Sequence, residues 1–201
     1  MSNDDKSATL FINKKYEKAL ISALQNFKNK VPLSKEDEMI LQALWHELTH
    51  LRTKDIFKFF SQLSPTDQLL LETITEFIAR HTYHEFFETL RPGTKPNYQK
   101  EIIEKSLGYQ TEVRRFRYVL KKFEINEKEA VKELESILFE DGENLRRRLI
   151  DWLSTKADLS EFQSDEILHI IIHAKNDKEF QKVVREYYEI SRRRKERRLS
   201  S

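Results

Sequence analysis

Apolar residues recur at intervals of three and four along almost the whole chain, which is the period of an amphipathic helix. The segment 11–27 shows this pattern early in the chain, and the segment 161–174 shows it again towards the end. The 201 residues include three glycines and four prolines, so few residues suit the many tight corners of a β-sandwich or barrel. We therefore predict an all-α, multi-helix bundle, and the single strand that we expect is Ala8–Ile12.

Capping signals mark the starts of two of the predicted helices. Ser34 followed by Asp37 is a capping box in its acidic form and predicts that a helix begins there. Ser64 before Pro65 predicts the start of a long helix that continues to about Thr89.

The composition changes near residue 125, where a first part with most of the histidines meets a highly charged second part. We predict a helical domain over residues 1–125 and a charged helical extension over residues 126–201. A chain of this length is long enough to bury a core without a disulfide or a structural metal.

Composition excludes several classes of protein. The chain contains no cysteine, which excludes a disulfide scaffold, a zinc ribbon, an iron–sulfur site and thiol catalysis. Its 36 basic and 34 acidic residues give a net charge of +2, so its overall field is not built to hold nucleic acid. No apolar run approaches the roughly 18–20 residues of a membrane span, and the polar start lacks the order of a signal peptide. We expect a cytoplasmic protein that does not bind membranes.

The sharpest motif is His46-Glu47-Leu48-Thr49-His50, an H-E-x-x-H pattern within a predicted helix. Four residues make slightly more than one helical turn, so His46 and His50 project from one face and can hold a single Zn²⁺. Glu47 lies beside them, where its carboxylate can take a proton from a zinc-bound water with a pKa of about 7. The motif therefore predicts a zinc site with Glu47 as the general base.

The motif and its surroundings resemble the HExxH zinc metallopeptidases, the zincins. Uncharged residues around the motif, such as Ala43, Leu44 and Leu51, agree with that family, whereas Arg52 departs from its pattern. No third histidine follows in the H-x-x-G-x-x-H pattern, which excludes the metzincin branch. The resemblance implies hydrolysis of a peptide or protein substrate at a zinc ion held by three protein ligands.

The segment from Leu71 to Ala79 is similar to the helix that supplies the third ligand in gluzincins, and to the E-x-x-x-N helix of the ImmA/IrrE repressor-cleaving peptidases. The resemblance implies that Glu72 is the third zinc ligand. Glu76 stands where the latter family has asparagine, a polar residue that steadies a zinc-bound histidine.

Helix geometry is compatible with either Glu72 or Glu76 as the third ligand. If the helix of the motif ran unbroken to Leu63, a tight hairpin would place Glu76 across from His50. Glu72 and Glu76 differ by about 6 Å along a helix axis. Glu72 reaches the site only if the first helix ends soon after His50, for example near Thr53. We take Glu72 as the ligand and Glu76 as its substitute.

Four further side chains on the same or later segments are candidates for this site. His81 and His84 follow on the helix of Glu72, and Tyr83 or Tyr109 would stabilise an oxyanion. The sequence does not choose between the two tyrosines.

One alternative interpretation is a ferritin-like di-iron protein. Glu47 and His50 form an E-x-x-H pair, and Glu166 and His169 form a second one. Di-iron proteins of that fold combine two such helices with a glutamate from each of two others. The candidates for these further glutamates are Glu17, Glu72, Glu76 and Glu112.

The other alternative is a non-catalytic helical adaptor that binds a protein or nucleic-acid partner through basic helix faces. The basic residues concerned are Arg114, Arg115, Arg117, Arg192, Arg193 and Arg194. Acidic residues such as Glu127 and Glu129 lie close by in the sequence, a balance typical of a solvated face. In this interpretation His46 and His50 bond locally and hold no metal.

Overall fold

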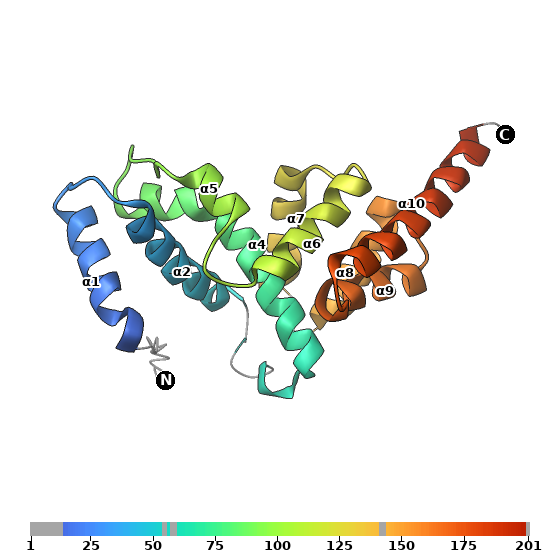
Figure 1. Ribbon diagram of the computed structural model, residues 1–201, viewed down its shortest axis with the longest axis horizontal. Coiled ribbons are helices and arrows are strands. Elements are labelled where there is room, and N and C mark those ends of the chain that lie inside the picture. Colours follow the sequence, from blue (N-terminus) through green and yellow to red (C-terminus); the bar gives the residue numbers. More distant parts are fainter. Residues whose placement is uncertain (1–13, 54–55, 57–59, 141–143, 200–201) are drawn as a thin grey trace, which may run out of the picture.

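The computed structural model describes residues 14–53, 56, 60–140 and 144–199, which form an elongated array of packed helices (Figure 1). The helices are α1 (Lys14–Lys28), α2 (Lys35–Leu51), the 3₁₀ helix η1 (Phe60–Gln62), α4 (Pro65–Leu90), α5 (Gln99–Glu104), α6 (Gln110–Lys122), α7 (Glu127–Glu140), α8 (Leu145–Ala157), α9 (Glu161–His173) and α10 (Asp177–Leu199). Within the described ranges there is no strand, so the predicted all-α bundle is confirmed. The expected strand Ala8–Ile12 lies outside them. None of the helices described is both long enough and apolar enough to cross a membrane.

The two predicted capping signals open the helices that carry the histidine motif and the glutamates. Ser34 Oγ accepts a hydrogen bond from the Asp37 N–H at 3.1 Å, and Asp37 Oδ2 accepts one from the Ser34 N–H at 3.1 Å. This reciprocal pair is a capping box at the start of α2. Ser64 Oγ accepts from the Asp67 N–H at 3.1 Å, and Pro65 occupies the first turn of α4.

The helix of the motif ends one residue after its second histidine. α2 stops at Leu51, and the Arg52 N–H donates to the Thr49 carbonyl at 3.1 Å. The Thr53 N–H donates to the His50 carbonyl at 3.0 Å, which closes the last turn. α2 therefore ends before Thr53, which is the condition under which Glu72 can reach His50.

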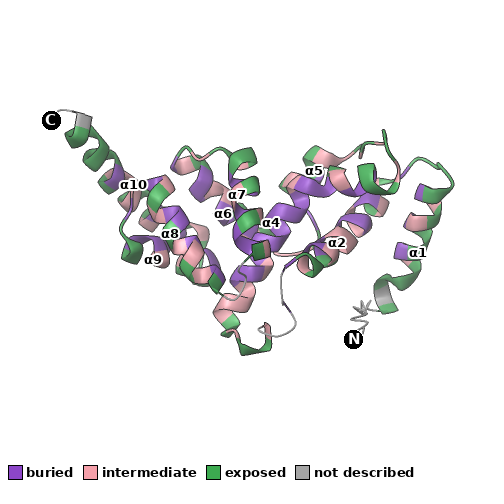
Figure 2. Cartoon of the chain, turned by 180° about the vertical axis from the view of Figure 1, so that it is seen from behind, coloured by how far each residue is buried: buried purple, intermediate pink, exposed green. Residues whose placement is uncertain are grey.

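Helix α4 is buried along most of its length (Figure 2) and contributes residues to two hydrophobic cores. In its first half, Leu71, Ile74 and Phe77 pack in a large core with residues of α6 to α10. In its second half, Tyr83 and Phe87 pack in a smaller core with residues of α1, α2 and α5. The helix therefore connects the two cores and packs directly on α2, the helix of the histidine motif.

The larger core continues across residue 125, where the composition changes. Val119 and Phe123 before this point, and Ala130 and Leu134 after it, belong to the same buried cluster. The charged extension predicted for residues 126–201 thus shares its core with the predicted domain 1–125. The last turns of α10 extend beyond the bundle (Figure 1).

A fragment that ends at residue 125 should not fold on its own. It would expose the apolar faces of α4 and α6 that the later helices cover, and the hydrophobic effect would no longer offset the entropy of ordering them. We expect the fragment 1–125 to show no cooperative thermal transition by circular dichroism, whereas the full chain unfolds cooperatively. A cooperative transition in the fragment would mean that the two halves are independent domains.

Candidate metal centre

The candidate site lies where α2 and α4 pack against each other. Gln42, His46 and His50 follow one another at intervals of four residues on α2, and Glu72 and Glu76 have the same interval on α4. Side chains with this spacing lie on one face of a helix. The two polar faces meet between the helices, so the histidines of the motif come together with both candidate glutamates.

Three ligand atoms of this group form an equilateral triangle. His46 Nε2 and His50 Nε2 each lie 3.1 Å from Glu72 Oε2, and the two nitrogens are 3.1 Å apart. Among the described residues, His46, His50 and Glu72 form a group that could hold a metal ion. Their side chains are 7%, 13% and 18% exposed, respectively, so the group is largely buried but open to solvent on the side of His50 and Glu72.

The triangle matches the geometry of tetrahedral zinc. Around a zinc ion with bonds of about 2.0 Å, neighbouring ligand atoms lie about 3.3 Å apart, close to the 3.1 Å edges found here. Two imidazole nitrogens and one carboxylate oxygen are a donor set that suits zinc, and three protein ligands leave a fourth position for water. The residues present therefore fit a zinc ion.

The other ring nitrogen of each histidine also has a partner. His46 Nδ1 lies 2.8 Å from Glu76 Oε2, and His50 Nδ1 lies 3.5 Å from the Thr75 hydroxyl. His46 Nδ1 thus faces the Glu76 carboxylate, while its Nε2 faces the triangle. Such contacts orient metal-binding histidines and fix their tautomer.

The sequence left Glu76 open as a substitute for Glu72 at the third ligand position, but the Glu76 carboxylate contacts His46 Nδ1 and not the triangle. The structure puts its carboxylate behind His46, at the nitrogen opposite the triangle, whereas Glu72 lies at the triangle. This is the position that the family resemblance gives to asparagine. Here a charged carboxylate occupies it.

The carboxylates and the imidazole stabilise each other's charged forms. Burial by itself lowers the pKa of His46, but hydrogen bonds and negative charge from Glu72 and Glu76 raise it to about 9. Burial likewise acts to raise the pKa of Glu72, yet contacts with His46 and His50 hold it well below its usual range. The pKa of Glu76 is also lowered, because His46 and Arg80 outweigh its burial. Both glutamates are thus carboxylates near neutral pH.

Further polar side chains that we did not predict surround Glu76. The Arg80 Nε–H donates to Glu76 Oε1 at 2.7 Å, and the Gln42 Nε2–H donates to Glu76 Oε2 at 3.3 Å. Ser106, which precedes α6, donates in turn to Gln42 Oε1. All of these side chains are buried. A sequence signal existed, because Gln42 lies four residues before His46 and Arg80 four residues after Glu76.

Tyr109 is the tyrosine that borders the site. Its ring stacks on that of His46, with centroids 5.9 Å apart and an angle of 19° between the planes. Burial raises the pKa of Tyr109, and the charge of Glu72, a hydrogen bond with Glu72 and the charge of Glu47 raise it further. Its backbone is left-handed, with φ of 47°, which costs about 1–2 kcal/mol in a residue other than glycine. Surrounding contacts must therefore hold it in place.

Three other candidates on α4 lie away from the triangle. His81 Nε2 lies 3.0 Å from Glu127 Oε2, which directs its ring towards α7, and His84 is exposed. Tyr83 is fully buried in the smaller core, and its hydroxyl has no hydrogen-bond partner. None of the three belongs to the group that includes His46.

The second E-x-x-H pair is not joined to the first. Glu166 accepts a hydrogen bond from the Tyr187 hydroxyl, and the exposed His169 packs against His173 with ring centroids 4.6 Å apart. Glu17 is exposed on α1, and Glu112 lies on α6. Within the described part of the chain, the metal-ligand group contains neither Glu166 nor His169.

The arginines predicted to bind a partner make intramolecular contacts. Arg115 is buried and donates to the carbonyls of Ile171 and Ala174, each at 3.0 Å. The exposed Arg114 pairs with Asp177 at 2.8 Å.

The remaining members of that set lie on α6 and α10. Arg117 pairs with Glu104 and Glu127, each at 3.0 Å. Arg192 pairs with Glu189 at 2.8 Å. Arg193 and Arg194 are exposed, and Arg194 Nη1–H donates to Gln163 Oε1 of α9 at 3.5 Å.

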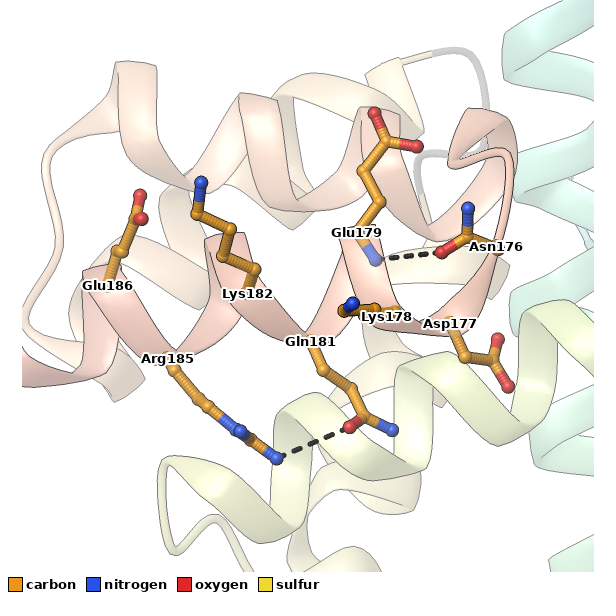
Figure 3. Close-up of a pocket in the computed structure, with 8 residues that line it drawn as sticks. All are labelled: Asn176, Asp177, Lys178, Glu179, Gln181, Lys182, Arg185 and Glu186. Carbon is orange, nitrogen blue, oxygen red and sulfur yellow. Dashed lines mark hydrogen bonds between the residues drawn. The ribbon is translucent and has the colours of Figure 1, made fainter.

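A separate hollow of about 920 Å³ lies along the first turns of α10 (Figure 3). It is lined by Asn176, Asp177, Lys178, Glu179, Gln181, Lys182, Arg185 and Glu186. Its polar groups bond to one another: Arg185 donates to Gln181 at 3.3 Å, and Asn176 Oδ1 accepts from the Glu179 N–H at 3.0 Å. The hollow includes no residue of the metal-ligand group.

No family model matches this chain, and neither the curated proteins nor the solved structures include a match. Its function is therefore inferred from the chemistry of the residues between α2 and α4.

Removing Arg80 should destabilise the fold. Arg80→Ala would leave the buried carboxylate of Glu76 without its guanidinium, a loss worth about 3 kcal/mol for a buried pair. Arg146 is a suitable comparison, because it pairs with Asp67 and Asp165 closer to the surface, and Arg146→Ala should cost about 1 kcal/mol or less. Urea unfolding of both variants measures the difference. Equal losses would contradict a special role for the buried pair.

Proposed function

We propose that the chain is a zinc-dependent hydrolase of peptide bonds, in which His46, His50 and Glu72 hold one zinc ion. The observation that carries the proposal is the triangle of His46 Nε2, His50 Nε2 and Glu72 Oε2, with edges of 3.1 Å. The contacts at Nδ1 of both histidines support it, because they leave each Nε2 directed at the same point.

Glu47 is the general base in this proposal. It is exposed next to His46 on the same helix, and its negative charge is felt at the Tyr109 hydroxyl, which supports a position on the open side of the site. A bound zinc ion supplies a Lewis acid that lowers the pKa of a water molecule to about 7. The Glu47 carboxylate accepts a proton from the attacking water and delivers it to the leaving amine.

Tyr109 is the hydrogen-bond donor for the developing oxyanion. Its pKa is raised by burial and by the nearby carboxylates, so the phenol keeps its proton at neutral pH. A neutral hydroxyl held beside the ligand group can donate to an oxygen that becomes negative.

The substrate is a peptide segment bound by helix faces. Zincins bind peptides along the edge of a sheet, by strand addition. The described residues contain no strand, so the surfaces of α2, α4 and the start of α6 around the triangle would have to hold the substrate.

Zinc binding is the first requirement of this function. The chain, supplied with zinc and freed from excess, should carry one zinc per chain by elemental analysis, and His46→Ala should carry none. His81→Ala is the control, because His81 lies on the same helix as Glu72 but contacts Glu127, and this variant should keep its zinc. Absence of zinc from the unchanged chain, or its retention by His46→Ala, would refute the site.

Hydrolysis should depend on the Glu47 carboxylate. Glu47→Gln removes the proton acceptor but no zinc ligand, so we expect a rate at least about 100-fold lower with the zinc content unchanged. Quenched fluorescent peptide libraries of mixed sequence measure the rate without a defined substrate. Glu36→Gln, an exposed position on α2, should keep full activity. Undiminished activity in Glu47→Gln would exclude this mechanism.

A further inference from the structure

We propose that Arg80 is a positioning residue that fixes Tyr109 over the zinc site by binding the backbone of the segment 105–109. This inference rests on the proposed zinc site. It adds a connection between the metal ligands and a segment that is distant from them in the sequence.

Arg80 contacts two parts of the site with one side chain. It is 1% exposed, and its Nε–H donates to Glu76 Oε1 at 2.7 Å while its Nη2–H donates to the Gly108 carbonyl at 2.6 Å. Glu76 Oε2 in turn lies 2.8 Å from His46 Nδ1. The guanidinium thus links the residue behind a zinc ligand to the backbone at Gly108.

The Gly108 carbonyl is the point at which Tyr109 is held. It belongs to the peptide unit that leads directly into Tyr109, whose left-handed backbone starts α6 without a side-chain cap. The start of α6 lies beside the middle of α4 (Figure 1). A fixed carbonyl at Gly108 therefore sets the direction in which the Tyr109 ring leaves the backbone, which is over His46.

A second link holds the same segment to the same glutamate. Ser106 donates to Gln42 Oε1, and the other end of the Gln42 amide donates to Glu76 Oε2 at 3.3 Å. Gln110, in the first turn of α6, donates to the Ser106 carbonyl at 2.6 Å. Both connections from the segment 105–109 therefore end at Glu76.

Arginine is required at position 80 by geometry as well as by charge. Its planar fork presents donors in two directions at once, whereas a lysine ammonium is a single point of charge on a flexible stem. Arg80→Lys therefore keeps a cation for Glu76 but gives up the simultaneous hold on Gly108. This variant separates the positioning role from charge neutralisation.

A double-mutant cycle on zinc affinity tests the proposal. Zinc affinity is measured by competition with a chelating indicator for the unchanged chain, Arg80→Lys, Tyr109→Phe and the double variant. Loss of a contact behind a metal ligand lowers affinity about 10–100-fold. Tyr109→Phe removes the hydroxyl that contacts Glu72, so we expect it to weaken zinc binding about 10-fold.

We expect Arg80→Lys to weaken zinc binding about 10-fold in the unchanged background, and to have little further effect when Tyr109 is already phenylalanine. Equal losses in both backgrounds would overturn the proposal, since Arg80 would then act through Glu76 alone. Arg115→Lys is the matched control. Arg115 is also buried and also binds a carboxylate and backbone carbonyls, but those of Asp177, Ile171 and Ala174, so zinc affinity should not change.

A measurement on the unchanged chain decides the question if Arg80→Lys fails to fold. The Gly108 and Tyr109 amides should have NMR order parameters of about 0.85, the value of rigid backbone, because Arg80 already holds the Gly108 carbonyl in the metal-free chain. Order parameters below about 0.6 at these amides, in a chain that takes up zinc, would overturn the inference and leave the zinc site standing. Failure to bind zinc at all would remove both.

Discussion

The arrangement between α2 and α4 depends on a charged carboxylate buried away from water. Glu76 is 2% exposed, and a carboxylate in such a place is costly unless its oxygens are hydrogen-bonded and its charge is balanced. Arg80, Gln42 and His46 meet this need together, from two helices. Meeting it also fixes the rotation of His46 and attaches the segment before α6. One electrostatic requirement thus determines the orientation of His46 and ties down the segment that leads into Tyr109.

The part of the site that was predictable from the sequence is the part that depends on spacing within a helix. His46 and His50 share a face because of the four-residue interval. Glu72 lies close to His50 because α2 ends at Leu51, near the break that the sequence predicted around Thr53. Contacts between distant segments were not predictable in the same way. Nothing in the sequence distinguishes Tyr109 from Tyr83, because the choice depends on α6 beginning beside α4. Arg80 and Gln42 were overlooked, although charged and polar residues within the apolar stretches of buried helices need partners.

The fold shows the same division between local and distant information. The helices were predictable from the capping residues Ser34 and Ser64 and from the apolar period. Capping and periodicity are both properties of short segments. The change in composition near residue 125 lies in the charged residues, whereas the membership of Phe123 and Leu134 in one core follows from apolar faces that the charge pattern does not reveal. Arg115 is a related case. It belongs to a basic cluster in the sequence, but its guanidinium binds carbonyls at the end of α9.

The end of α2 has an electrostatic consequence of its own. The peptide dipoles of a helix add up to about half a negative charge at the C-terminal end, concentrated on the carbonyls of the last turn. His50 belongs to that turn, because α2 ends at Leu51. The triangle therefore lies in a field that attracts cations and repels anions. The helix end that makes room for Glu72 also lowers the energy of a divalent ion there, before any ligand bond is counted.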